Sequence, residues 1–370
     1  MPARNRLTSL AMSDPRIVAY ARLLVEHSLD VQPGWQVLVR TTPLARPLHD
    51  EVVRQIARRG AYALSRVSWT EWPVDLNWAQ HAPAELVGRL PPADLALIEQ
   101  MDARISILAP ENMRQEADLT GEQLVLIRQA RRPFFRRTMN DEIPWVGCQY
   151  PTPALAQEAG MTTDAFADLL FAAVLRDWQA EGTRMRRYCD RFDVASEVRI
   201  VGGGTDLRLS LEGRQGAVSE GFHNLPDGEF FFSPVEDSAE GVIEFGEFPA
   251  ESDGHPIEGI RLVFRAGEVV EASARLGEHA LHAALATDAG AKRIGELGIG
   301  CNEGITQYLR NTLFDEKIAG TIHLALGQSY TRVGGTNDSA IHWDIVKDLR
   351  PGGRIELDGE VVQQDGRWVS

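Results

Sequence analysis

The first half of the chain alternates between two hydrophobic periods. Apolar residues recur every three or four positions in DPRIVAYARLLVEHSL (14–29) and RPLHDEVVRQIARRGA (46–61), and this spacing predicts helices. Each of these segments is followed by a β-favouring run, WQVLVRTT (35–42) and YALSRVSW (62–69), that predicts a strand. The alternation predicts an α/β layer whose strands are mainly parallel.

The pattern changes in the second half. ARISILAP (103–110) predicts a further strand of the first type, and a long helical stretch covers residues 164–192. From there on, short alternating strands with glycine turns dominate, as in residues 195–216. We therefore expect an α/β N-terminal domain over residues 1–190 and a β-rich α+β C-terminal domain over residues 191–370.

Composition narrows the class of protein. A chain of 370 residues with 44% hydrophobic and 25% charged residues is typical of a globular protein with more than one core. It has no uninterrupted apolar run of about eighteen residues, which argues against a membrane span. The net charge of -15, without a long Lys/Arg run, disfavours nucleic acid as a partner.

Cysteine usage and the N-terminus bear on the compartment. The three cysteines, Cys148, Cys189 and Cys301, lie far apart in no CxxC arrangement, which excludes a cysteine-rich zinc module and indicates a reducing compartment. The N-terminal MPARNRLTSLAMSDPR (1–16) is interpreted as a leader that is not a secretory signal. We therefore expect a cytoplasmic protein.

The segment SAIHWDIV (339–346) places two polar side chains that are costly to desolvate in an apolar, β-favouring frame. On a strand, His342 and Asp344 share one face, while the segment's large apolar residues share the other. One face is therefore typical of a core, and the other is typical of a binding or catalytic site.

A second histidine and two glutamates stand in similar frames. His323 lies in AGTIHLALGQSY, Glu296 in IGELGIGCNEGI, and Glu229 directly before three phenylalanines in LPDGEFFFSPVEDS. A carboxylate in an apolar setting needs a cation or dense hydrogen bonding, and neither glutamate segment supplies an adjacent Lys or Arg. A bound metal ion would meet this need.

The donor types indicate which metals would bind. Two Glu, two His and one Asp without a cysteine ligand match zinc, cobalt, manganese or magnesium. Five ligands are more than one catalytic zinc normally takes, whereas two divalent ions sharing a bridging carboxylate would use all five. The candidate ligands are Glu229, Glu296, His323, His342 and Asp344.

Taken in order, these four segments resemble the aminopeptidase T and aminopeptidase S family of metallo-aminopeptidases. The likeness extends to GGGTDLRLSLEGR and, more weakly, to the N-terminal region. It implies that the same five residues are metal ligands, and that the hydroxyl of Tyr330 stabilises the oxyanion of a tetrahedral intermediate. It also implies peptide substrates with a free N-terminus, a homodimer, and an N-terminal domain that encloses the site. Gly228 and the LGIGCNEGI segment depart from the commoner family pattern. These departures leave the candidate ligands intact, so the resemblance does not imply the family's substrate preference.

Three hypotheses follow. The first is a metal-dependent aminopeptidase that attacks the peptide bond with a water activated by two metal ions. Its general base would be a carboxylate beside that water. Glu303 and Glu236 are candidates, although the sequence around each is more typical of a surface or loop acid. The second is a mononuclear iron ring-cleaving dioxygenase of a related branch, and the third is a non-catalytic binding relative. Retention of both Glu229 and Glu296 favours the peptidase.

Overall fold

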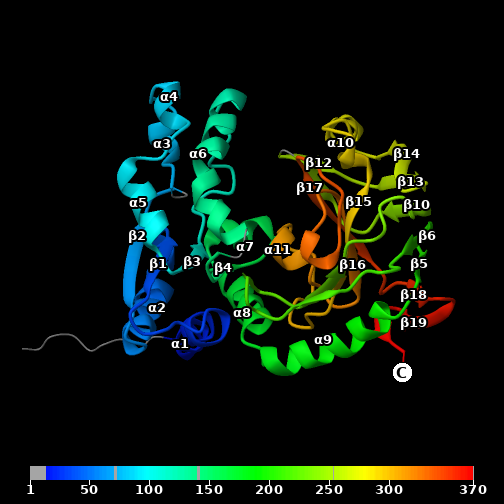
Figure 1. The fold of residues 1–370 in the computed structure, drawn as a ribbon, viewed down its shortest axis with the longest axis horizontal. Coiled ribbons are helices and arrows are strands. Elements are labelled where there is room, and N and C mark those ends of the chain that lie inside the picture. The colour runs from blue at the N-terminus through cyan, green and yellow to red at the C-terminus, as the bar shows by residue number, and fades with distance from the viewer. Residues whose placement is uncertain (1–13, 71–72, 140–141, 253, 370) are drawn as a thin grey trace, which may run out of the picture. The chain divides into compact units, whose positions relative to one another are not determined.

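The computed structural model describes residues 14–369 except 71–72, 140–141 and 253 (Figure 1). Residues 1–13 of the predicted leader lie outside the described residues. Contacts divide the chain into two compact units, one ending at Ala156 and the other beginning at Gln157. The predicted boundary between residues 190 and 191 stays a prediction, because contacts alone do not show which segments fold independently. Within the described residues, no helix has both the length and the apolar character needed to cross a bilayer.

The first unit is built on parallel strands, as the alternating pattern predicts. Its strands follow the order β2-β1-β3-β4, and each neighbouring pair is parallel. The apolar run of β1 is buried on both faces because helices cover the sheet. The strands are β1 (Gln36–Thr41), β2 (Tyr62–Val67), β3 (Ala103–Leu108) and β4 (Trp145–Gln149).

Helices connect these strands. Helix α1 begins at Pro15 because the carboxylate of Asp14 accepts a hydrogen bond from the backbone N–H of Arg16. It changes to a π-helical turn over Leu23–Ser28, so the predicted helix has two parts. The helices are α1 (Pro15–Arg22), α2 (Arg46–Arg58), α3 (Leu76–Ala79), α4 (Ala84–Val87), α5 (Pro92–Gln100), α6 (Gly121–Met139) and α7 (Pro153–Glu158).

The second unit begins with two helices and continues as strands. The stretch predicted as one long helix is broken: α8 (Thr163–Val174) ends, and the side chain of Asp177 caps a new helix, α9 (Trp178–Asp193). Two short helices follow later, α10 (Glu278–Leu285) and α11 (Thr312–Asp315). The predicted combination of an α/β region and a β-rich region is confirmed.

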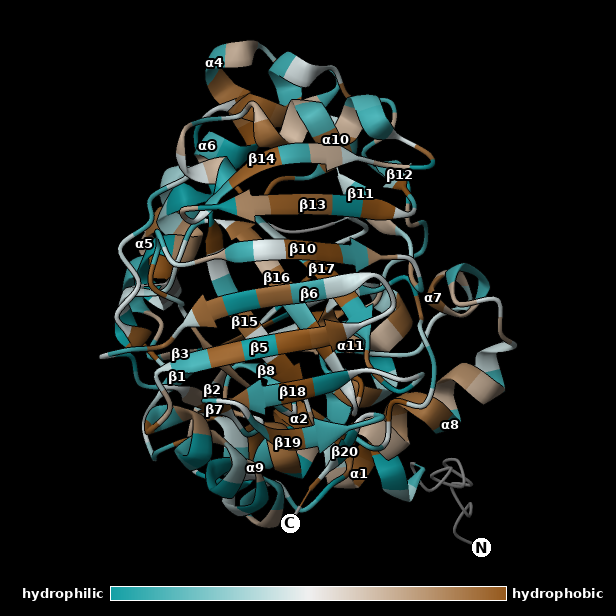
Figure 2. Cartoon of the chain, turned by 90° about the vertical axis from the view of Figure 1, so that its right-hand side faces the viewer, coloured by the Kyte–Doolittle hydropathy of each residue, from teal (hydrophilic) through white to brown (hydrophobic). Residues whose placement is uncertain are grey.

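An eight-stranded antiparallel sheet forms one layer of the second unit, in the order β14-β13-β10-β6-β5-β18-β19-β20. Figure 2 shows its strands side by side, with hydrophobic and hydrophilic residues alternating along them. The strands are β5 (Glu197–Gly202), β6 (Thr205–Ser210), β10 (Glu240–Phe245), β13 (Ile260–Arg265), β14 (Glu268–Ser273), β18 (Arg354–Leu357), β19 (Glu360–Gln364) and β20 (Arg367–Trp368).

The other layer is a five-stranded sheet in the order β17-β16-β15-β9-β7. Its four pairings are antiparallel. The strands are β7 (Ala217–Ser219), β9 (Glu229–Phe232), β15 (Ile294–Gly300), β16 (Thr321–Gly327) and β17 (His342–Asp348). The remaining strands are the short β8 (Asn224–Leu225) and the hairpin of β11 (Ala250–Ser252) and β12 (His255–Ile257).

The core of the second unit lies between the two sheets. Alternate residues of the five-stranded sheet enter it, among them Phe230, Leu297, Leu324 and Ile345, and all four are buried. Burial of each such side chain contributes about 1.5–3 kcal/mol of stability. Because alternation has period two, the residues between them project from the opposite face of the sheet. That face carries the candidate site.

Candidate metal centre

Strand register brings the five predicted ligands to one face of the five-stranded sheet. Glu296 on β15 and Asp344 on β17 both lie opposite Ala325 of the intervening β16. His342 pairs with Gly327 of the same strand, one step of two residues further along the same face. Four candidate ligands therefore come from three adjacent strands, and Glu229 joins them from β9, beyond β15.

A glycine makes room for the central histidine. Gly298 of β15 lies directly opposite His323 of β16. A Cβ atom at this glycine would stand 1.9 Å from Cε1 of His323, far inside any van der Waals contact. The imidazole therefore occupies the space that a side chain at residue 298 would fill.

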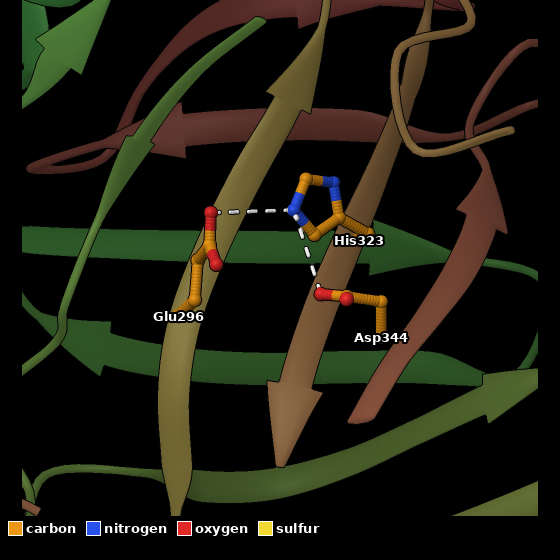
Figure 3. Close-up of side chains that lie close together, drawn as sticks. All are labelled: Glu296, His323 and Asp344. Carbon is orange, nitrogen blue, oxygen red and sulfur yellow. Dashed lines mark hydrogen bonds and ion pairs between the residues drawn. The ribbon is translucent and has the colours of Figure 1, made fainter. Parts of the chain in front are cut away.

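The two imidazoles and two of the acids form a tight cluster. His342 Nε2 lies 3.1 Å from Glu296 Oε2 and 3.6 Å from Asp344 Oδ1. His323 Nε2 lies 3.4 Å from Glu296 Oε1 and 3.9 Å from Asp344 Oδ1 (Figure 3). One donor atom from each of Glu296, His323 and Asp344 lies within 4.8 Å of the other two, a spacing that suits one shared cation.

Backbone carbonyls orient both imidazole rings. Nδ1 of His342 lies 2.7 Å from the carbonyl oxygen of Gln328, and Nδ1 of His323 lies 3.2 Å from that of Glu316. A carbonyl oxygen only accepts, so each Nδ1 carries the hydrogen and donates it. Each Nε2 is then directed toward the acids, the arrangement found in histidines that bind metal ions.

Glu229 has a cation partner that the sequence prediction missed. Nζ of Lys317 lies 3.4 Å from Oε1 of Glu229 and also contacts the carboxylate of Glu316. Lys317 is fully buried. The partner is not adjacent in the sequence, because this lysine comes from the turn between α11 and β16. No local pattern distinguishes a buried lysine from an exposed one in the segment FDEKIAG.

Two carboxylate oxygens of the cluster remain without a hydrogen bond. Oε2 of Glu229 and Oδ1 of Asp344 are buried and have no hydrogen-bond partner among the described residues. Buried polar atoms are normally satisfied, because leaving one unpaired costs about 1–3 kcal/mol or more. A divalent cation bound by these oxygens would remove that cost, so the donor set fits a metal ion.

The pKa values in the cluster reflect a balance between burial and the neighbouring charges. Burial favours the neutral acid of Glu296, but hydrogen bonds from His323 and His342 outweigh it and lower its pKa to about 2. Burial disfavours both imidazolium ions, yet the neighbouring carboxylates raise the pKa of His323 to about 10 and of His342 to about 11. Burial raises the pKa of Glu229 to about 8, although Lys317 opposes the shift.

Tyr330 borders the cluster. Its ring centroid lies 5.1 Å from that of His342 and 5.3 Å from that of Phe231. Burial, reinforced by the carboxylates of the cluster, raises the pKa of the Tyr330 phenol far above its usual range. The hydroxyl therefore keeps its proton and is available as a hydrogen-bond donor.

The two acids considered as general bases have structural partners. Glu303 is exposed and lies 3.3 Å from Arg184. Glu236 lies 2.6 Å from Arg214 and accepts hydrogen bonds from the backbone and the hydroxyl of Thr336. Both contacts support the interpretation of these residues as surface or loop acids.

A buried set of carboxylates and imidazoles on one face of a sheet, with oriented rings and unsatisfied oxygens, is typical of a metalloenzyme. Comparison with known sequences gives the family. The model of the thermophilic metalloprotease family (M29) matches residues 13–368, and the chain belongs to this family. The resemblance found in the signature segments is thereby confirmed.

Relatives that match most of the chain support this placement. Aminopeptidase 2 of Geobacillus stearothermophilus is 28% identical, with 95% of this chain and 97% of the relative covered. The structure of wild-type AmpT from Thermus thermophilus has the same fold, with a TM-score of 0.82, 22% identity, and 96% and 99% of the two chains covered. A 2,5-dihydroxypyridine dioxygenase from Pseudomonas putida KT2440 has a related fold, with a TM-score of 0.58, 14% identity, and coverage of 96% and 97%.

Proposed function

We propose that the chain is a metal-dependent aminopeptidase that removes residues from the N-terminus of peptides. The observation that carries the proposal is the convergence of Glu229, Glu296, His323, His342 and Asp344 on one face of the sheet. Membership of a metalloprotease family and the printed names of the relatives support peptides as substrates.

We propose that these five residues hold two divalent ions, of zinc, cobalt, manganese or magnesium. The ions would supply a water of lowered pKa and a positive charge at the scissile carbonyl oxygen. Glu296 is suited to bridge them, because its two oxygens face different histidines: Oε1 faces His323 and Oε2 faces His342. Oε2 of Glu229 and Oδ1 of Asp344, which accept no hydrogen bond among the described residues, would supply further donors for the two ions.

The remaining steps belong to side chains around the ligands. Tyr330, whose phenol stays protonated, donates a hydrogen bond to the oxyanion of the tetrahedral intermediate. The carboxylate of Glu316 interacts electrostatically with Asp344 and His323 but is not one of the five candidate ligands, and we assign it the general-base role. It accepts the proton of the attacking water and passes it to the leaving amine. Its contact with Lys317 holds it in place.

One observation favours a second candidate, a mononuclear iron ring-cleaving dioxygenase. Only three of the candidate ligands, Glu296, His323 and Asp344, form the compact group within the described residues, while Glu229 is paired with Lys317. A single ion bound to this smaller group would leave Glu229 to the lysine. The fold likeness to a dioxygenase is compatible with this arrangement but shows the fold alone.

Metal stoichiometry combined with turnover decides between the two. Metal-loaded protein is assayed for bound metal by mass spectrometry and for hydrolysis of amino-acid p-nitroanilides. The aminopeptidase predicts close to two ions per chain, and hydrolysis that chelator abolishes and zinc, cobalt or manganese restores. One iron per chain, with oxygen uptake on hydroxylated aromatic substrates and no peptidase activity, would establish the dioxygenase instead.

A pair of matched variants tests the ligand assignment. Glu296→Gln removes one charge from the proposed bridge, whereas Glu360→Gln makes the same change at an exposed residue of β19. We expect the first variant to lose most bound metal and activity and the second to retain both. Full metal-dependent activity in Glu296→Gln would contradict the assignment.

We also propose a homodimer in the cytoplasm. Strand β2 lies at the edge of the sheet of the first unit, where Tyr62 and Val67 are 66% and 51% exposed. Trp69, just beyond the strand, is 73% exposed. Large exposed apolar side chains on an unpaired strand edge are typical of an association surface.

A further inference from the structure

The loop after β16 carries an arginine at the border of the cluster. Arg332 is exposed, and its guanidinium carbon lies 5.0 Å from the ring centroid of Phe231 and 5.6 Å from that of Tyr330. Tyr330 in turn faces His342, with 5.1 Å between the ring centroids. One aromatic ring therefore separates the guanidinium from a candidate ligand.

The loop that carries Arg332 is held firmly at both ends. At its start, the N–H and the hydroxyl of Ser329 both donate to the carbonyl oxygen of Asn337, and the N–H of Tyr330 donates to the hydroxyl of Ser233. At its end, the N–H of Thr336 donates to Glu236. These bonds hold the backbone of the loop in place, and the two aromatic contacts place the guanidinium over the rings of Phe231 and Tyr330.

The charge of Arg332 has no acidic partner. Among the described residues, no carboxylate lies within ion-pair distance of it, whereas Arg214, which packs near Gly334 of the same loop, is paired with Glu236. An arginine side chain stays charged at every physiological pH, and its planar fork matches a carboxylate in two hydrogen bonds. Arg332 is thus a positioned cation with unused donors.

We propose that Arg332 binds a carboxylate of the substrate on the leaving-group side of the scissile bond. The inference rests on the proposed aminopeptidase function and names its substrate class. These substrates are short peptides with a carboxylate one or two residues beyond the cleaved bond. An extended peptide spans about 3.3–3.6 Å per residue, so such a carboxylate reaches past a single aromatic ring.

Electrostatics set the direction of the peptide. Arg332 repels the N-terminal ammonium group of a peptide and attracts a carboxylate. A short peptide therefore binds with its carboxylate at Arg332 and its N-terminus directed away from the arginine, toward the candidate ligands.

The carboxylate can come from the C-terminus of the peptide or from an acidic side chain. A panel of substrates distinguishes these two sources. The panel contains Leu-Gly, the amidated Leu-Gly-NH2, the amidated Leu-Asp-NH2 and leucine p-nitroanilide. Leu-Gly offers a C-terminal carboxylate, Leu-Asp-NH2 offers a side-chain carboxylate, and the other two offer none. Preference for Leu-Gly alone assigns the C-terminus, and equal preference for Leu-Asp-NH2 assigns a carboxylate from either source.

The test compares wild-type enzyme with Arg332→Met and Arg332→Lys. We expect Arg332→Met to raise KM for Leu-Gly on the order of tenfold to a hundredfold with little change in kcat, as loss of a charged hydrogen bond implies. Leucine p-nitroanilide and Leu-Gly-NH2 should be unaffected. Arg332→Lys keeps the charge without the planar fork and should give an intermediate KM.

A matched control and a metal measurement complete the test. Arg265→Met alters an exposed arginine of β13, on the other sheet, and should leave every substrate unchanged. Metal content should be equal in all variants. The inference is overturned if Arg332→Met slows p-nitroanilide and dipeptide equally, or if wild-type enzyme cleaves the p-nitroanilide but does not distinguish Leu-Gly from its amide. A wild-type enzyme that cleaves no aminoacyl substrate overturns the proposed function and this inference with it.

Discussion

At the scale of single residues, charge balance is the main feature of the cluster. Glu229 and Glu316 are held close together in a water-poor environment, which is costly unless a cation compensates them. Lys317 provides a permanent positive charge at that point. Lys317 therefore compensates part of the acidic cluster without a metal ion.

Replacing this lysine tests its role in stability. Lys317→Met removes the cation and leaves the buried acids uncompensated, which we expect to cost about 3–5 kcal/mol in the free energy of unfolding. Urea unfolding of metal-free protein measures the loss. Lys292→Met, at an exposed lysine, is the control and should change stability little. Equal stability of the two variants would show that Lys317 does not compensate the acids.

Proton affinities predict how metal binding depends on pH. In metal-free protein the raised pKa values of His323, about 10, and His342, about 11, keep both imidazoles protonated near neutrality. A metal ion must displace these protons, so its apparent affinity should rise about tenfold per pH unit for each proton displaced. Calorimetric titration in buffers of different ionisation enthalpy counts the protons released. Affinity that is constant from about pH 6 to about pH 9 would contradict this.

The same shifts set the pH dependence of stability in the metal-free protein. Because the folded-state pKa values of the two histidines are raised, their contribution is fully present below the unfolded value of about 6.5 and is lost as pH rises through about 10 to 11. Glu296 behaves oppositely. Because its pKa is lowered, Glu296 contributes stability at pH values above the ordinary pKa of a glutamate. This contribution is lost as the pH falls toward about 2.

At the scale of elements, the site is a product of strand register. The sheet brings residues from β9, β15, β16 and β17 together because alternate positions share a face. A register slip of one residue would turn every candidate ligand into the core. The apolar residues on the other face, packed against the eight-stranded sheet, therefore hold the candidate ligands in place.

Close approach between β15 and β16 gives an element-scale prediction. Gly298→Ala adds a Cβ atom where the imidazole of His323 stands, so the ring must move away from Glu296. We expect the variant to fold with reduced stability and to lose most of its bound metal, measured after dialysis. Gly246→Ala is the matched control, because nothing lies within 4 Å of a Cβ there. Normal metal content in Gly298→Ala would show that the sheet accommodates the methyl group.

At the scale of the whole molecule, association is the property to test. We expect the wild-type protein to sediment as a dimer, and Val67→Lys to shift it toward monomer by placing a charge on the exposed edge of β2. Val361→Lys, at a 38% exposed residue of β19, is the control. A monomeric wild-type protein, or a dimer indifferent to Val67→Lys, would exclude this edge as the contact.

The sequence by itself determined the faces and the donors. Period-two alternation around His323, His342 and Asp344 is a local property, so it separated core residues from candidate site residues without any knowledge of the fold. The change from alternating helices and strands to mainly short strands is also a local property of the sequence. The break between α8 and α9 was missed because one capping aspartate interrupts an otherwise continuous helical pattern.

Only the tertiary structure decided what surrounds the donors. The pairing of Lys317 with Glu229, the space that Gly298 leaves for His323, and the contact of Arg332 with Phe231 join residues far apart in the chain. Such contacts depend on register between strands and on burial. Alternation along a single strand shows which face a side chain occupies. It does not show the register between strands or which residues the side chain contacts.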